Sequence, residues 1–159
     1  ALYVGISRWP LEALKVAHEY LKQRDVPLLI YQGRLNLIDR APQDEGILDF
    51  CASNGIGFIS FSPLAQGLLT DKYLKEIPSD SRMAQKGSLR PEMLDASLLS
   101  RLQLYNAMAA RRGETLARMA LEWILAQRGI TSVLVGASSV GQLSENLKCI
   151  DAKPFEEDI

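Results

Sequence analysis

The sequence predicts an α/β fold of parallel strands alternating with helices, and within that class part of a (β/α)8 barrel. Four short apolar segments have strand character, at residues 2–6, 27–31, 56–61 and 131–135. Helical patterns follow three of them, at a spacing typical of βαβ units. Polar side chains follow the carboxyl ends of all four strands, which is where a barrel places its active site.

An open, doubly wound sheet is the alternative that this alternation also allows. Its dinucleotide-binding form needs a G-x-G-x-x-G motif after the first strand, but residues 5–10 read Gly-Ile-Ser-Arg-Trp-Pro. Four strands are too few to close a barrel. We therefore expect residues 1–159 to form one domain, without an internal linker, that supplies part of a barrel.

The helices are predicted from apolar stripes and from capping residues. Residues 10–22 open with a proline in the first turn, and residues 43–52 repeat apolar positions at helical spacing. A long insertion after the third strand holds a loop rich in proline and glycine, followed by helices over 95–111 and 114–127. Gly113 suits the position after a helix end, and serines suit the start of a last helix over 139–149.

Composition excludes several classes of function. The chain has 18 Lys and Arg against 19 Asp and Glu, a net charge of −1, which gives no electrostatic case for nucleic acid or an anionic membrane. Two cysteines form neither a metal pattern nor a disulfide framework, which fits a cytoplasmic protein. The single histidine, His18, excludes serine and cysteine hydrolase triads and argues against a zinc site.

No apolar run is long enough for a membrane span. Ala1 leads straight into the first strand without an initiator methionine, so we expect a segment in front of it.

Six motifs occur in order along the chain, and together they resemble the C-terminal half of an aldo-keto reductase. The subgroup they resemble contains bacterial glyceraldehyde-3-phosphate-type reductases and potassium-channel β subunits. The motifs are VGISRW at 4–9, YQ at 31–32 with NL at 36–37, FSPLAQG at 61–67, KY at 72–73, IPSDSR at 77–82, and VGASS at 135–139 with Gln142, Glu145 and Asn146.

The resemblance implies a (β/α)8 barrel that binds NADPH without a Rossmann motif. This chain would supply strands five to eight, the long loop after the seventh strand and the last cofactor-binding helix. The family's catalytic Tyr, Lys, Asp and His lie on the first four strands, so no catalytic residue is expected here. The residues that fail to match that tetrad are His18, Tyr3, Tyr20, Tyr31, Tyr73 and Tyr105.

The adenosine end of NADP is expected at the last helix. A helix start presents backbone N–H groups and the positive end of its dipole to an anion. Ser138 can donate to a 2′-phosphate, and three polar residues follow it on one helical face. On spacing alone, a serine N-cap with solvated polar neighbours is the favoured explanation, and the accompanying motifs shift the balance to a cofactor site. By resemblance the cofactor residues here are Gly136, Ser138, Gln142, Glu145 and Asn146.

The nicotinamide end is expected at the other strand ends. Phe61 can stack on the ring, Ser7 and Gln32 can bind its carboxamide, and Arg8 can approach the cofactor or a substrate phosphate. Without the motifs, Phe61 is also explained as a core residue, and Lys72 and Arg82 as surface cations. By resemblance the long loop clamps the pyrophosphate through Ser62, Pro63, Leu64, Ala65, Gln66, Lys72 and Arg82.

The resulting hypothesis is an NADPH-dependent oxidoreductase that reduces small aldehydes or ketones to alcohols. The alternatives are an NADP-binding regulatory module similar to a potassium-channel β subunit, and a half-barrel without activity. The expected partners are a carbonyl substrate and either the missing N-terminal half or further copies of the chain. We expect this chain alone to be inactive and to use no metal.

Overall fold

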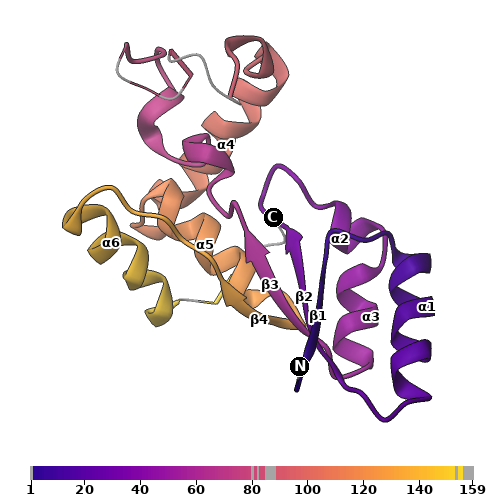
Figure 1. Cartoon of the computed structure of the whole chain (residues 1–159). Coiled ribbons are helices and arrows are strands. Elements are labelled where there is room, and N and C mark those ends of the chain that lie inside the picture. The colour runs from indigo at the N-terminus through magenta and orange to yellow at the C-terminus, as the bar shows by residue number, and fades with distance from the viewer. Residues whose placement is uncertain (1, 80, 82, 85–88, 153, 156–159) are drawn as a thin grey trace. The chain divides into compact units, whose positions relative to one another are not determined.

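The computed structural model describes residues 2–79, 81, 83–84, 89–152 and 154–155 (Figure 1). The chain divides into two compact units. The first unit comprises residues 1–63 and 123–135, and the second comprises residues 64–122 and 136–159. The helix α5 (Leu116–Ala126) contributes residues 116–122 to the second unit and 123–126 to the first.

The first unit is built on a four-stranded parallel sheet in the order β1-β2-β3-β4. Its strands are β1 (Val4–Ser7), β2 (Leu28–Arg34), β3 (Gly57–Phe61) and β4 (Ile130–Val133). The sequence order of the strands is also their order in space, as in a barrel wall. The prediction of a parallel-strand α/β fold is therefore confirmed.

Helices α1 (Leu11–Lys22), α2 (Ala41–Asp44) and α3 (Ile47–Ser53) cover one face of this sheet (Figure 1). The prediction of one helix over 43–52 is wrong. Gly46 lies at φ 76°, in the left-handed region that glycine adopts without a steric penalty, and it separates α2 from α3.

The core of the first unit centres on Phe58, whose side chain is fully buried. Its ring packs beside that of Tyr31, with 5.5 Å between centroids. Gly33 makes this possible, because a Cβ there would lie 2.6 Å from Cζ of Phe58. Each such buried side chain stabilises the fold by about 1.5–3 kcal/mol. This packing holds β2 and β3 together below the strand ends.

The second unit contains the long insertion and the last helix. Its 3₁₀ turns are η1 (Ala65–Gly67), η2 (Asp71–Tyr73), η3 (Pro91–Met93) and η4 (Lys148–Asp151), and its other helices are α4 (Ala96–Arg112) and α6 (Val140–Leu147). Asp95 caps α4, its carboxylate accepting from the N–H of Leu98 at 2.7 Å. Gly113 ends α4 at φ 71°, as its position in the sequence predicts.

A buried ion cluster lies within the second unit. The carboxylate of Glu122 is fully buried and accepts from Arg112 at 2.9 Å and from Arg118 at 2.7 Å. Arg112 also pairs with Glu114 and donates to the carbonyl of Pro154 at 3.0 Å. A buried carboxylate needs such partners, because an uncompensated charge would be strongly destabilising. The cluster thus links α4, α5 and the segment after η4.

Candidate functional site

The strand-end part of the candidate site lies in the first unit. Ser7, the last residue of β1, pairs in register with Gln32, and Phe61 ends β3. The N–H of Arg8 donates to the carbonyl of Gln32 at 3.1 Å, which continues the pairing one residue beyond β1. The carboxyl ends of parallel strands lie at the same end of the sheet, so these predicted residues are gathered there.

Asn36 fixes the turn that follows β3. It is 1% exposed, and its amide donates to the carbonyl of Ser62 at 3.0 Å. Its own carbonyl oxygen accepts from the N–H groups of Ile38 and Asp39 at 3.0 and 2.9 Å. One buried amide therefore ties the loop after β2 to the loop after β3. The sequence motif contains Asn36, but its partner 26 residues away gave no signal of this role.

The loop part of the site belongs to the second unit. The carbonyl of Leu64 accepts from the N–H of Gly67 at 2.8 Å, which closes a tight turn that includes Ala65 and Gln66. Thr70 caps η2, and Lys72 follows it with an exposed side chain. The predicted Arg82 lies outside the described residues. Of the two loop cations predicted to bind the pyrophosphate, Lys72 is therefore the one within the described part of the chain.

Left-handed backbone conformations concentrate at predicted cofactor residues. Among the described residues, five that are not glycine have positive φ: Arg8, Asp25, Ser62, Ala65 and Gln66. Four of these five were predicted to bind the cofactor. Such conformations cost on the order of 1–3 kcal/mol each and cluster at ligand sites, where the surrounding structure maintains them.

The start of α6 brings Ser138 and Gln142 together. The side-chain oxygen of Gln142 accepts from both the N–H and the hydroxyl of Ser138, each at 2.9 Å. Ser139 caps the helix by accepting from the N–H of Gln142 at 3.2 Å. Two donors of Ser138 thus converge on one oxygen. A phosphate oxygen at that point would accept the same two hydrogen bonds.

Glu145 and Asn146 lie in the second half of α6. Glu145 is half-buried, and its two oxygens accept from Thr115 at 3.2 Å and from Lys148 at 2.5 Å. The hydrogen-bonded ammonium of Lys148, followed by Thr115, lowers the pKa of Glu145 and keeps the carboxylate ionised. Asn146 is 6% exposed. Gly136, which precedes this helix, is exposed with open space where a Cβ would lie.

Three titratable side chains that lie outside these clusters make contacts that serve the fold: Tyr31, Cys51 and His18. The hydroxyl of Tyr31 donates to the carbonyl of Trp9 at 2.7 Å, and burial raises the pKa of Tyr31. Burial also raises the pKa of Cys51 to about 11, so this thiol is not activated. His18 packs edge-on against Phe50 at 5.6 Å between centroids.

No group of three or more His, Cys, Asp or Glu side chains among the described residues is placed to hold a metal ion. Nor does this part of the chain contain a helix with the length and apolarity that crossing a bilayer requires.

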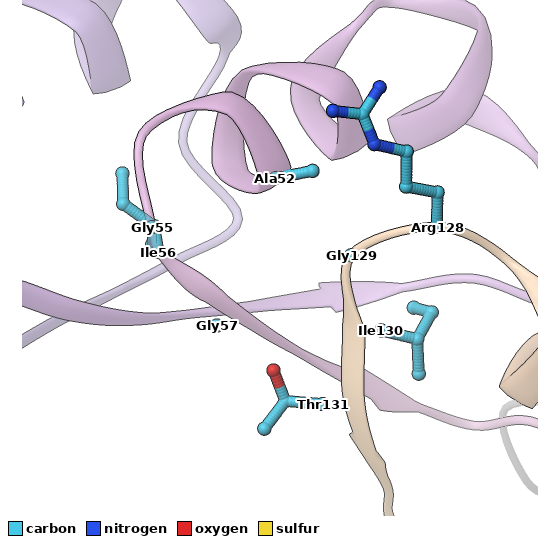
Figure 2. A pocket seen from close by; sticks show the side chains of 8 residues that line it. All are labelled: Ala52, Gly55, Ile56, Gly57, Arg128, Gly129, Ile130 and Thr131. Carbon is cyan, nitrogen blue, oxygen red and sulfur yellow. The ribbon is translucent and has the colours of Figure 1, made fainter.

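A shallow pocket of about 350 Å³ lies at the amino-terminal end of the strands, where β3 and β4 begin (Figure 2). Arg128 is the one charged residue in its lining, and its side chain extends away from the strands (Figure 2). The other lining residues are Ala52, Gly55, Ile56, Gly57, Gly129, Ile130 and Thr131. In a barrel this end of the strands serves stability, so the pocket is separate from the candidate site.

Comparison with known proteins agrees with these features. The chain matches the Aldo/keto reductase family over residues 1–159. It is 46% identical to L-glyceraldehyde 3-phosphate reductase of Escherichia coli K12, over 98% of this chain and 46% of that protein. It is 33% identical to a probable voltage-gated potassium channel subunit beta of Arabidopsis thaliana, over 98% of this chain and 48% of that protein.

A crystal structure of the thermostable aldo-keto reductase Tm1743, in complex with the inhibitor epalrestat, matches with a TM-score of 0.69 and 25% identity. The match covers 97% of this chain and 44% of that one. The chain thus spans about half the length of the relatives it matches. Nearly all of its own residues are included in these matches. By sequence and by fold, the chain belongs to the aldo/keto reductase family.

Proposed function

We propose that this chain is the cofactor-binding part of an NADPH-dependent reductase that converts small aldehydes or ketones into alcohols. The observation that carries the proposal is the coincidence of strained backbone with predicted cofactor residues. Arg8, Ser62, Ala65 and Gln66 adopt positive φ without being glycine. Such conformations persist only where the surrounding structure holds them, and they cluster at ligand sites.

The start of α6 fits the 2′-phosphate of NADP. In the structure, Gln142 places a neutral oxygen between the N–H and the hydroxyl of Ser138. A phosphate would replace that oxygen with a charged one, which strengthens each hydrogen bond and adds the attraction of the helix dipole. Gln142 would then be free to turn toward the phosphate or the adenine.

The remaining predicted residues would orient the cofactor. Bound NADPH supplies the hydride that reduces the carbonyl carbon. Phe61 would stack on the nicotinamide, and Gln32 and Ser7 would hold its carboxamide, so that one face of the ring points to the substrate. Lys72 would attract the pyrophosphate as a point charge, together with Arg82. The tyrosine that donates the proton would lie outside this chain.

The outer strands of the sheet, β1 and β4, favour pairing with a further chain segment. Among the described residues, β1 and β4 each pair with one neighbouring strand only. Apolar side chains near these edges are exposed, Leu2 by 86% and Leu134 by 47%. Exposed edges and apolar surface are normally covered. We therefore propose that the missing N-terminal half, or another copy of the chain, completes the barrel in the cytoplasm.

The test is cofactor binding by the full-length protein after replacing Ser138 and Gln142 together with alanine. Hydrogen bonds to a charged group contribute about 1.5–3 kcal/mol, so the dissociation constant for NADPH should rise roughly 10- to 100-fold. The constant for NADH, which lacks the 2′-phosphate, should change far less. Equal weakening of both would show that these residues do not bind the 2′-phosphate.

A regulatory NADP-binding module is the second candidate, favoured by the 33% identity to a channel β subunit. Both candidates would bind NADP, so binding does not separate them. Steady oxidation of NADPH by a simple aldehyde in the full-length protein would support the reductase, and binding without turnover would support the module. The isolated chain should show no turnover, and activity in it would contradict the assignment of the catalytic residues to another segment.

A further inference from the structure

We propose that Thr115 is a positioning residue that holds the carboxylate of Glu145 in place for the adenine of the cofactor. This inference rests on the proposed function, in which Glu145 lies at the adenosine end of NADP. It concerns a threonine that precedes α5 and is 30 residues distant from Glu145 in the sequence.

The geometry of the Thr115 hydroxyl fixes the direction of its proton. Its oxygen accepts from the backbone N–H of Arg118 at 3.1 Å, the pattern of an N-cap at the start of α5. A hydroxyl carries one proton to donate. That proton is directed to Oε1 of Glu145 at 3.2 Å. The cap of one helix therefore holds an acidic side chain of another.

The second oxygen of Glu145 is held differently. Lys148, the first residue of η4, donates to Oε2 at 2.5 Å, but 57% of its own side chain is exposed. A long exposed lysine keeps much of its rotamer freedom, whereas a β-branched threonine at a helix cap is stiff. Of the two partners, Thr115 is the one that restricts where the carboxylate lies.

A carboxylate held in this way keeps acceptor capacity for a ligand. Its two oxygens offer about four lone-pair positions, and the bonds to Thr115 and Lys148 use two. The side chain of Glu145 is 33% exposed, so a ligand can reach it. The adenine amino group is a donor with two hydrogens, which suits this acceptor. Because Glu145 is already ordered, adenine binding would not bear the cost of ordering it.

The experiment measures dissociation constants of the full-length protein for NADPH and for its hypoxanthine analogue, in which a carbonyl oxygen replaces the adenine amino group. The unmodified protein should prefer NADPH, since a carboxylate repels that oxygen. Thr115→Gly removes the hydroxyl but keeps an acceptable N-cap residue. We expect it to weaken NADPH binding by about 3- to 10-fold and the analogue by much less.

Two further variants separate positioning from stability. Thr115→Ser keeps both hydrogen bonds and should restore the preference for NADPH. Thr115→Asp keeps a capping acceptor, lacks a proton to donate and places a like charge near Glu145, so it should lose the preference. Asp95→Gly is the matched control, because it alters the cap of α4 in the same unit. It should leave both constants unchanged.

The outcomes distinguish this inference from the proposed function. If the unmodified protein prefers NADPH over the analogue and Thr115→Gly preserves that preference, the inference is overturned and the proposed function stands. Equal weakening of both ligands by Thr115→Gly also overturns the inference, since a merely structural role would act on both. If the unmodified protein does not bind NADPH, the proposed function fails and takes the inference with it.

Discussion

The strand ends of the first unit and the helix α6 of the second are both candidate cofactor sites, but different interactions hold them. At the strand ends, a buried amide and backbone pairing set the geometry, as Asn36 shows with its hydrogen bonds to Ser62, Ile38 and Asp39. On α6, exposed side chains bond one another, as Gln142 does with Ser138. The first geometry is held by buried groups of the chain itself. The second holds internal hydrogen bonds that a ligand would replace.

The largest expected effect comes from a substitution in the core beneath the strand ends. Phe58→Ala removes a fully buried ring that packs on Tyr31 and over Gly33. We expect the free energy of unfolding to fall by about 3–5 kcal/mol, measured by urea denaturation. Phe61→Ala on the same strand is the comparison. Because Phe61 is half-buried, it should cost less stability and act mainly on nicotinamide binding.

An intermediate effect is expected where the buried amide is lost. Asn36→Ala leaves the Ser62 carbonyl and two backbone N–H groups without their partner, which should lower the unfolding free energy by about 2–3 kcal/mol. Asn54→Ala is the control, since Asn54 is exposed and its side-chain amide donates to the carbonyl of Phe50. It should cost below about 1 kcal/mol. Equal losses in the two variants would contradict the framing role of Asn36.

The smallest expected effect is the pH dependence of stability that comes from Glu145 on α6. The pKa of Glu145 is lowered in the folded chain, so its contribution to stability is present above the unfolded pKa of about 4.3 and lost as pH falls through the folded value. Lys148→Met should remove most of this contribution, below about 1 kcal/mol for an exposed pair. Urea denaturation should show the variant less stable at neutral pH and equal to the parent in acid. A difference that persists in acid would mean that Lys148 acts through packing.

Strand and helix identity follows from the sequence, because apolar periodicity and capping residues act locally. All four predicted strands exist with shifted ends, as do the helices predicted after the first and last strands, whereas the helix predicted over 43–52 is divided into α2 and α3. β2 runs to Arg34, beyond the predicted end at residue 31, because it stays paired with β3 as far as Phe61. The break at Gly46 was missed, since the apolar positions on its two sides keep helical spacing.

The candidate site residues come from the sequence, whereas the side chains that support them emerge only from the structure. Gln142 and Ser138 meet because they are four positions apart at a helix start, a relation that spacing reveals. Asn36 and Thr115 act on residues 26 and 30 positions away, which only the folded chain brings near. Thr115 directly precedes α5, but the helix was predicted from residue 114, so the N-cap signal of this threonine was missed.

The chain's two thiols offer a way to time the opening of each unit. Cys51 is completely buried in the first unit with its pKa raised to about 11, and Cys149 is half-buried in the second, where burial also raises its pKa. Alkylating reagents attack the thiolate, so each cysteine becomes reactive once its surroundings separate and water reaches the sulfur. The labelling rate of Cys51 would therefore report how often α3 leaves the sheet. The ratio of the two rates, without any engineered probe, would show whether the units open as one body or independently.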